Sequence, residues 1–519
     1  MKLIMLCALF APIIYLALRQ KKKWYLYLFF AFIAVLPEQF SVRLHDSLPL
    51  ISATRILILL VMGFWLYDKW KTKNFHFPKS LLLFLAVNLI VSFVNLRYGF
   101  GELNRIFLFI FERVLVVIMI ADMIRDREEF NRCIDFAIMG CTALAVIGII
   151  QTVFNYDISS VLHLTKTITS IQLNKRMGLV RAFGTYNAIS FGCYCSFMAL
   201  LILYRLYNTK SIWHSLAFAF NFVALICTFT RSAWLCLAGI VFLILLVYRM
   251  ELLRRLWSGL VMILALLVLL CCFQPKLFSA FVETGKSSIN TVLGVLPEEV
   301  VSLFVPDQNN MHPSHNNSEP SSTEDSTIPD ETEPVSPDAN RPGFTLDKDF
   351  GMNANDPTYS RTAQWTAVQY MAQEGDLLFG YGYNALPRGM IHFFFDRWAA
   401  KWQPTTFLDV GFVALIAEGG LVGALSYLGL LGYLFVYAFR KKSPFKERKM
   451  DFYWLAFFMI PLYLLLNYLA SFLFAHIVWI FIGLFFTHKK LCETVPVVAE
   501  LQKSAVPENV LPAPDADTP

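Results

Sequence analysis

Charged residues are scarce in this 519-residue chain, where Asp, Glu, Lys and Arg together make up 16% of the sequence. A soluble domain carries about 25%, so the composition excludes a large soluble globular domain. Hydrophobic residues make up 57% of the chain, and many apolar runs approach the roughly 20 residues that cross the hydrocarbon core of a membrane. The composition predicts an all-α fold, a polytopic helical membrane protein.

Motifs for metal and nucleotide binding are also absent. The chain has no HExxH, no phosphate-cradling GxxxxGK and no Asp-x-Asp pair in an outer loop near a span. None of its ten cysteines lies in residues 274–404, and their spacing matches neither a disulfide framework nor a zinc site. We therefore expect no metal and no other cofactor.

Basic residues contribute to a net charge of +6 and gather in short segments between apolar runs. The positive-inside rule places such clusters in the cytoplasm, and their position in short loops argues against nucleic-acid binding. This assignment puts the N-terminus outside and the C-terminus inside. It predicts about 12–13 spans, at 3–18, 24–38, 49–68, 79–96, 105–124, 134–154, 188–206, 214–230, 232–248, 258–273, 406–438, 452–469 and 470–486.

The spans divide the chain into four parts. Residues 1–273 form a first transmembrane bundle of ten spans, and residues 405–486 hold the C-terminal transmembrane helices. Residues 274–404 form one large extracytoplasmic loop. Its acidic middle, about 305–358, is rich in Ser, Thr, Pro and Asn and is predicted to be disordered because it cannot bury enough apolar surface. In the rest of the loop, about 359–404, apolar residues recur at helical spacing, which predicts an ordered helical part. Residues 487–519 are a predicted disordered cytoplasmic tail.

Four polar residues fall on the predicted outer side: Arg181, Arg231, Arg361 and Asp409. Each has an alternative interpretation. Arg231 could anchor a helix end at lipid headgroups, Arg181 and Arg361 could be ordinary loop charges, and Asp409 could complement a helix dipole. Together, however, arginines and a carboxylate at one membrane surface suit an anionic, lipid-linked substrate, because arginine binds phosphate oxygens bidentately.

Other charges lie within the apolar runs. Glu418 precedes the pair Gly419–Gly420 in a run too long for one straight crossing, which predicts a helix that breaks at the glycines. Glu112 and Arg113 are interpreted as a buried polar pair, and Arg55 as the anchor of a helix end.

Four motifs, in order, resemble the bacterial O-antigen ligase and O-antigen polymerase superfamily of polytopic membrane glycosyltransferases. They are RAFGTYNAISFG (181–192), TFTRSAW (228–234), SRTAQWTAVQYMAQEGDLLFGYGY (360–383) and TTFLDVGFVALIAEGGLVG (405–423). The predicted topology agrees, with many spans and one large outer loop late in the chain. Asp409 stands about where the ligases carry histidine, which favours the polymerase branch.

The resemblance implies a metal-independent transfer of a glycan from undecaprenyl diphosphate. Arg231 and Arg361 would bind and neutralise the diphosphate, Asp409 would be the candidate base, and Arg181 and Glu418 would contribute to substrate binding.

The implied activity is the polymerisation of undecaprenyl-diphosphate-linked oligosaccharide repeat units into a surface polysaccharide, at the outer face of the cytoplasmic membrane. The implied partners are the lipid-linked donor and acceptor, the bilayer, and flippase and chain-length regulator proteins. A ligase that transfers finished glycan to a surface acceptor is the alternative. A lipid-linked oligosaccharide transporter is a further one, but no internal repeat typical of transporters is evident.

Overall fold

A computed structural model covers the chain. It describes residues 10–16, 19, 22–36, 41–42, 51–72, 78–98, 101–156, 175–176, 179–184, 188–209, 211–293, 359–374, 377–382, 385, 411–441, 451–469 and 476–504.

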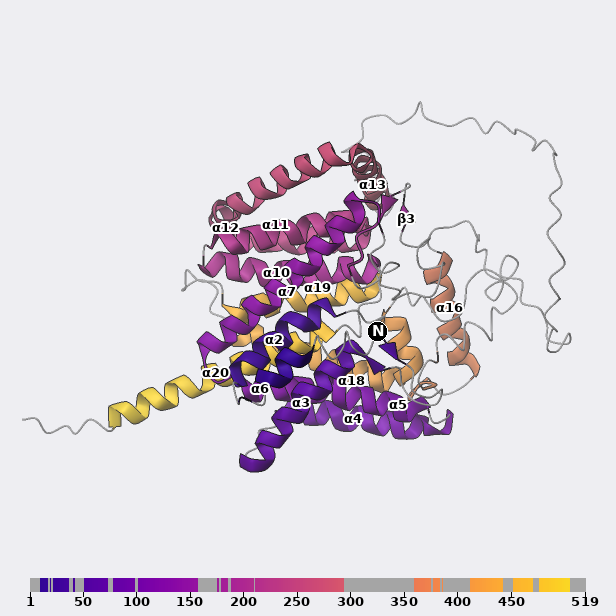
Figure 1. Cartoon of the computed structure of the whole chain (residues 1–519). Helices are drawn as coiled ribbons and strands as arrows, with labels where there is room; N and C mark the ends of the chain where they lie inside the picture. The colour runs from indigo at the N-terminus through magenta and orange to yellow at the C-terminus, as the bar shows by residue number, and fades with distance from the viewer. Residues whose placement is uncertain are drawn as a thin grey trace, which may run out of the picture. The chain divides into compact units, whose positions relative to one another are not determined.

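The described part is almost entirely helical, which confirms the predicted fold class of an all-α polytopic membrane protein (Figure 1). Its long helices are α2 (Lys22–Val35), α3 (Ala53–Thr72), α4 (Lys79–Asn95), α5 (Gly101–Leu108), α6 (Leu115–Met123), α7 (Arg127–Val153), α10 (Ala188–Thr209), α11 (Ile212–Cys227), α12 (Arg231–Phe273), α13 (Pro275–Leu293), α16 (Tyr359–Glu374), α18 (Gly411–Lys441), α19 (Phe452–Leu469) and α20 (His476–Ser504). A 3₁₀ turn, η1 (Leu96–Tyr98), follows α4, and a π-helical segment, η2 (Phe109–Val114), joins α5 to α6. Two short antiparallel hairpins pair β1 (Ser41–Val42) with β2 (Ile51–Ser52), and β3 (Lys175–Arg176) with β4 (Leu179–Val180).

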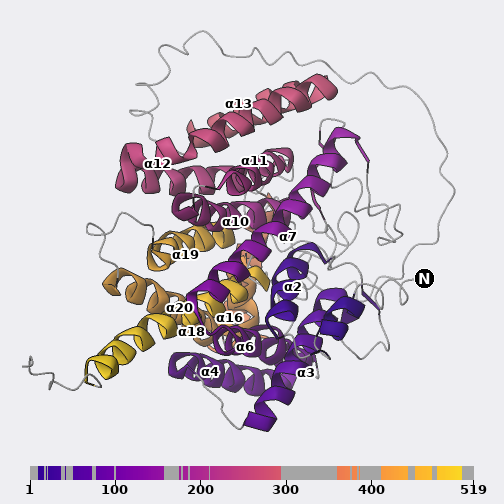
Figure 2. The ribbon, with the colours of Figure 1, turned by 60° about the vertical axis from the view of Figure 1, so that its left-hand side comes forward.

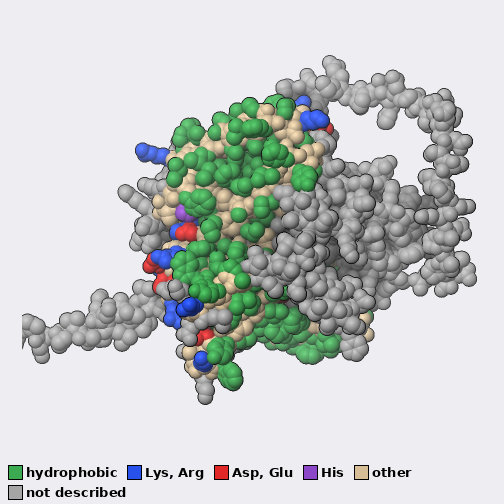
Figure 3. All heavy atoms as spheres, viewed as in Figure 1, with side chains coloured by type: hydrophobic (Ala, Val, Ile, Leu, Met, Phe, Trp, Pro, Cys, Tyr) green, Lys and Arg blue, Asp and Glu red, His purple; other side chains and the backbone are tan. Residues whose placement is uncertain are grey.

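Several helices in the described residues have the length and composition of membrane spans. Five are long and apolar enough to cross a membrane, namely Lys79–Tyr98, Arg127–Val153, Ala188–Thr209, Leu256–Phe273 and Gly411–Lys441. Four shorter apolar helices are Trp24–Ile33, Ile212–Cys227, Arg231–Val247 and Phe452–Tyr468. Figure 3 shows hydrophobic side chains over much of the visible face, with Lys, Arg, Asp and Glu mostly along its left-hand edge and a smaller group at the upper right. The number of spans and the side on which each loop lies stay predictions.

The core centres on α7 and α10. α7 packs against α2 and α11, α10 packs against α11, α12 and α19, and α20 packs against α6. Figure 2 shows α7 running across the bundle, with α10 and α11 on one side and α2 on the other. α10 is buried from Phe191 to Tyr207. A helix that is hydrophobic on all sides is typical of such an interior position.

Helix α12 turns back on itself, as two successive spans at 232–248 and 258–273 require. The first residue of α12, Arg231, follows four residues after the last residue of α11. Gln274 directly follows the last residue of α12. Its Nε2 donates a hydrogen bond to the carbonyl oxygen of Val153, at the end of α7 (3.4 Å). Ser258, in its middle, lies at the opposite end of the bundle, with its Oγ 2.9 Å from the Oγ of Ser215 at the start of α11. Both ends of α12 therefore lie at one end of the bundle.

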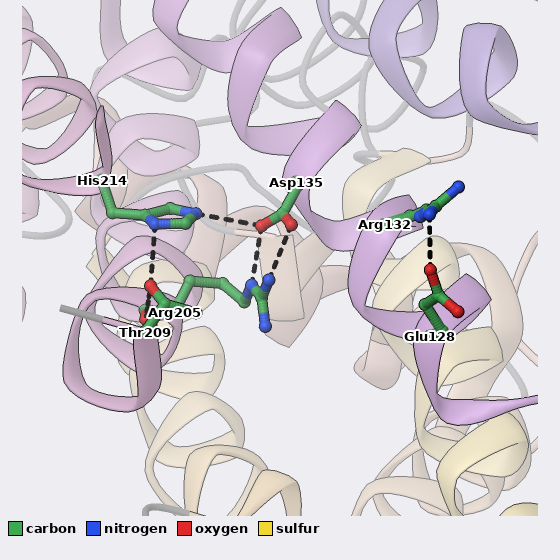
Figure 4. A network of polar contacts seen from close by, with 6 residues as sticks. All are labelled: Glu128, Arg132, Asp135, Arg205, Thr209 and His214. Atoms are coloured by element: carbon green, nitrogen blue, oxygen red, sulfur yellow. Dashed lines mark hydrogen bonds and ion pairs between the residues drawn. The ribbon is translucent and has the colours of Figure 1, made fainter. Parts of the chain in front are cut away.

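At the opposite end, a charged network joins α7, α10 and α11 (Figure 4). The guanidinium of Arg205 donates two hydrogen bonds to Asp135, from Nε at 2.7 Å and from Nη2 at 2.6 Å. The Nε2 of His214 lies 3.0 Å from Asp135 Oδ1, and its Nδ1 lies 2.9 Å from Thr209 Oγ1. The bidentate pair fixes the register of α7 relative to α10, and His214 connects α11 to both helices.

We expect Asp135→Ala to lower the stability of the bundle by about 2 kcal/mol, less than the 3–5 kcal/mol of a fully buried pair. We expect a smaller effect than for a fully buried pair because the Asp135 side chain is 32% exposed, although that of Arg205 is only 11% exposed. The measurement is the thermal unfolding midpoint of the purified protein in detergent. Glu128→Ala is the matched control, because Glu128 forms an exposed ion pair with Arg132 on the same helix and such pairs contribute about 0.3–0.5 kcal/mol. Equal shifts for the two variants would contradict the expectation.

Two of the charges within the apolar runs have different surroundings from those predicted. Arg55 forms an ion pair with Glu112 of η2, so its interpretation as a simple helix anchor is wrong. The guanidinium of Arg113 lies 5.9 Å from the ring centroids of both Phe109 and Trp479. Glu112 is therefore part of a pair between helices, and Arg113 packs over aromatic rings.

The later parts of the chain agree only in part with the predicted boundaries. α20 is helical to Ser504 and so extends into residues 487–519, the predicted disordered tail. Residues 1–281 and 360–519 form one compact unit and residues 282–359 a second, of which the structure describes chiefly the last part of α13. The predicted disordered insert at 305–358 lies outside the described residues.

Candidate functional site

The segment RAFG, residues 181–184, lies against the turn that joins α11 to α12. The backbone N–H of Ala182 donates to the carbonyl oxygen of Cys227 (2.9 Å). Arg181 donates from Nε to the carbonyl oxygen of Thr228 (2.7 Å) and from Nη2 to Thr230 Oγ1 (3.0 Å). Two motifs nearly 50 residues apart are thus in direct contact, and Arg181 touches the residue that precedes Arg231.

The turn itself is tightly constrained. Phe229 is buried and has a φ of 51°, a left-handed conformation that is uncommon for residues other than glycine. Thr228 Oγ1 donates to the carbonyl oxygen of Leu225 (2.7 Å) and accepts from the N–H of Thr230 (3.2 Å). Thr230 Oγ1 donates in turn to the carbonyl oxygen of Ala188, at the start of α10 (3.1 Å). The hydroxyl groups of this turn therefore fix the point at which α12 begins.

Arg231 is the first residue of α12 and is partly buried. A cation at the N-terminus of a helix opposes the helix dipole, at a cost of about 0.3–1 kcal/mol. The charge is thus not placed there for helix stability. The guanidinium of Arg181 binds the residue that precedes Arg231, so the two arginines come from the same turn, and two arginines at one turn suit an anion.

A buried glutamine holds the RAFG segment in place. Gln151 of α7 is completely buried, and its Nε2 donates to the carbonyl oxygen of Gly184 (2.9 Å). Its Oε1 accepts from the N–H groups of Phe183 (3.2 Å) and Gly184 (2.9 Å). Sequence reasoning missed this residue, although a polar side chain inside an apolar run is the signal that could have identified it.

We expect Gln151→Leu to destabilise the protein by about 1–3 kcal/mol for each backbone group left unsatisfied, and to displace Arg181. Gln151→Glu provides a sharper comparison, because a neutral carboxyl group can keep all three hydrogen bonds of Gln151, whereas leucine keeps none. We therefore expect a smaller loss of stability for the Glu variant than for the Leu variant. Unfolding midpoints of the two variants test this; an equal or larger loss for Gln151→Glu would contradict it.

A second cluster forms where α18 breaks. Gly420 has a φ of 64° and a ψ of −170°, which confirms the predicted break at the glycine pair. The turn Leu377–Gly382 fills the gap. Tyr381 N donates to the carbonyl oxygen of Ala417 (2.9 Å), and Leu421 N donates to that of Leu377 (3.0 Å). These bonds satisfy backbone groups that a broken helix leaves without partners.

Glu418 is buried beside this break. Its carbonyl oxygen accepts from the N–H of Gly382 (3.2 Å) and from Nδ2 of Asn95 (3.2 Å), which also donates to the carbonyl oxygen of Phe379 (2.8 Å). Asn95 of α4, absent from the predicted site, thus connects the Gly-x-Gly turn to the transmembrane bundle.

The structure brings together only some of the predicted site residues. Arg181 and Arg231 lie at one turn, and Glu418 lies at the break of α18. The backbone of Arg361 lies in the first turn of α16, but its side chain is outside the described part, and Asp409 is outside it as well. Among the described residues, no group of three or more His, Cys, Asp or Glu side chains could hold a metal ion.

A comparison with protein families finds one match, over residues 216–428, to the family described as O-antigen ligase. The matched segment contains Arg231, Arg361, Asp409 and Glu418 but not Arg181. No curated protein matches the chain. The matched segment, the order of the motifs and the all-α membrane fold agree with one another, and residues 216–428 of the chain are similar to the O-antigen ligase family.

Proposed function

We propose that this protein polymerises undecaprenyl-diphosphate-linked oligosaccharide repeat units into a surface polysaccharide, at the outer face of the cytoplasmic membrane. The observation that supports this most is the contact of Arg181 with the turn at which Arg231 begins α12. This contact places two arginines at one turn at an end of the bundle, where the diphosphate of a lipid carrier would lie at the membrane surface.

In the proposed reaction, a hydroxyl group of one lipid-linked glycan attacks the anomeric carbon of the donor sugar. The new C–O bond forms as the bond between that carbon and the diphosphate oxygen breaks, and undecaprenyl diphosphate leaves with the electron pair. Arg231 and Arg361 would stabilise the negative charge that develops on the diphosphate. Asp409 would accept the hydroxyl proton.

The proposed roles differ in their support. Two hydrogen bonds of Arg181 go to Thr228 and Thr230, so its proposed contribution to substrate binding includes holding the turn that carries Arg231. Glu418 would shape the substrate-binding region at the break of α18, where its carbonyl oxygen accepts a hydrogen bond from the N–H of Gly382. The roles of Arg361 and Asp409 rest on the resemblance of their motifs alone.

The alternative is a ligase that transfers finished glycan from the same carrier to a surface acceptor. The description of the matched family favours it, whereas Asp409, in place of the histidine of the ligases, favours the polymerase. Both activities use the same donor and the same displacement at the anomeric carbon.

The lipid-linked glycans that accumulate after deletion of the gene separate the two activities. A polymerase deletion should accumulate single lipid-linked repeat units, and a ligase deletion should accumulate long lipid-linked polymer. Mass spectrometry of the extracted lipid fraction measures this directly. If neither species accumulates, the proposal fails.

A further inference from the structure

A cluster of titratable side chains lies where α7, α19 and α20 meet, apart from the candidate site. The Nε2 of His488 lies 3.1 Å from Asp451 Oδ1 and 3.6 Å from Cys492 Sγ. The Nη2 of Arg127 lies 4.0 Å from the same sulfur. Cysteine and imidazole from α20 thus meet a carboxylate at the start of α19, as in sites that activate a thiol.

The hydrogen-bonding roles in this cluster follow from its geometry. An ionised carboxylate only accepts hydrogen bonds, so the Nε2 of His488 that faces Asp451 carries a proton. The thiol of Cys492 therefore cannot donate to that nitrogen, and its sulfur is the acceptor. The guanidinium of Arg127 is a second donor that faces the sulfur. The sulfur thus faces a guanidinium and an N–H that it shares with Asp451, and such donors favour the thiolate form.

The cluster is rigid on one side and accessible on the other. The ring of His488 is 6% exposed and packs against Phe130, Phe452 and Tyr453, with ring centroids 5.6, 5.4 and 4.6 Å away. Cys492 is partly exposed, whereas six of the other described cysteines are buried. Cys492 is therefore more accessible than these six cysteines, while the imidazole beside it is held by aromatic rings.

The electrostatic environment agrees with the geometry. Burial by itself would lower the pKa of His488, but the hydrogen bonds and charges of Asp451 and Cys492 raise that pKa to about 9. Burial opposes ionisation of Cys492, yet the hydrogen bond and charge of His488 lower the pKa of its thiol. The titratable and charged groups near Cys492 are His488 on α20, Asp451 and Tyr453 at the start of α19, and Arg127 on α7.

We propose that Cys492 is a redox-sensitive modification site that reacts with low-molecular-weight disulfides such as glutathione disulfide. The Cys492 thiolate attacks one sulfur of the disulfide and forms a mixed disulfide. The original S–S bond breaks, and the other half leaves as a thiolate with the electron pair and takes a proton from water. A free thiol reverses the reaction by the same exchange. This proposal is independent of the proposed glycosyl transfer.

The test is the rate at which glutathione disulfide modifies Cys492 in the purified full-length protein between pH 6 and 8, with the peptide that contains Cys492 followed by mass spectrometry. The reference thiol is N-acetylcysteine, whose rate should rise about tenfold per pH unit in this range, because its thiolate fraction does so. For Cys492 we expect a smaller rise than for N-acetylcysteine, because a thiol with a lowered pKa is already more ionised at pH 6. A tenfold rise per unit, parallel to that of N-acetylcysteine, would overturn the proposal.

Two variants test the cause of the reactivity. His488→Asn should restore a pH dependence like that of the reference thiol and slow the reaction at pH 6 about tenfold or more, the factor expected for each unit by which the thiol pKa rises. If this variant fails to fold, Arg127→Gln replaces it, because Arg127 is exposed, and it should slow the reaction at pH 6 by a smaller factor. Arg132→Gln on the same helix is the matched control. Equal rates for the Arg127 and Arg132 variants would count against the proposal.

Discussion

Replacement of Arg231 by alanine should abolish detectable glycan polymerisation while the protein remains folded. Removal of a single charged group that stabilises a transition state typically costs about 10²–10³ in rate. The side chain stands at the N-terminus of α12, where its charge opposes the helix dipole, so its loss costs no favourable interaction with that dipole. The measurement is polymer length and yield in a reconstituted assay with purified lipid-linked repeat units.

One further variant separates charge from geometry at this position, and a second, elsewhere in α12, is a control. Arg231→Lys keeps the charge but loses the bidentate fork, and we expect it to retain only part of the activity. Arg254→Ala is the matched control, since Arg254 is an exposed residue of the same helix, α12, near its reversal. Wild-type activity of Arg231→Ala would remove Arg231 from the proposed site.

Gly420→Ala should prevent the docking of the Gly-x-Gly turn into α18, with a loss of several kcal/mol in stability and of all activity. A Cβ at Gly420 would lie 2.3 Å from the backbone nitrogen of Gly380 and 2.4 Å from the carbonyl oxygen of Leu378. The φ of 64° and ψ of −170° are also nearly restricted to glycine, at a cost of about 1–3 kcal/mol for other residues. Backbone atoms cannot move aside as a flexible side chain can.

Gly429→Ala is the control for this variant, in the same helix. A Cβ at Gly429 would meet nothing within 4 Å, and alanine stabilises a helix by about 0.5–1 kcal/mol relative to glycine. The unfolding midpoint should therefore fall strongly for Gly420→Ala and stay level or rise for Gly429→Ala. If both variants unfold at the wild-type temperature, the docking of the turn onto α18 contributes little to stability.

Much of the fold could be predicted because it depends on local composition. Long apolar runs must form helices in a membrane, where every backbone polar group needs a partner within the protein. The break of α18 was also predictable, because Gly419 and Gly420 interrupt a run that is too long for one crossing. α20 was predicted less well. The apolar pattern ends near residue 486, but the helix continues to Ser504.

By itself, the sequence determined the fold class, the approximate helices, the family motifs and the choice of arginines as candidates. The tertiary structure decided which groups meet. Nothing near Arg181 in the sequence indicates that it binds Thr228 and Thr230, or that Gln151 holds the same segment. Arg55 likewise meets Glu112 only through packing of α3 against η2. Hydropathy records how each segment partitions into the membrane, whereas these contacts depend on how helices distant in sequence pack against one another.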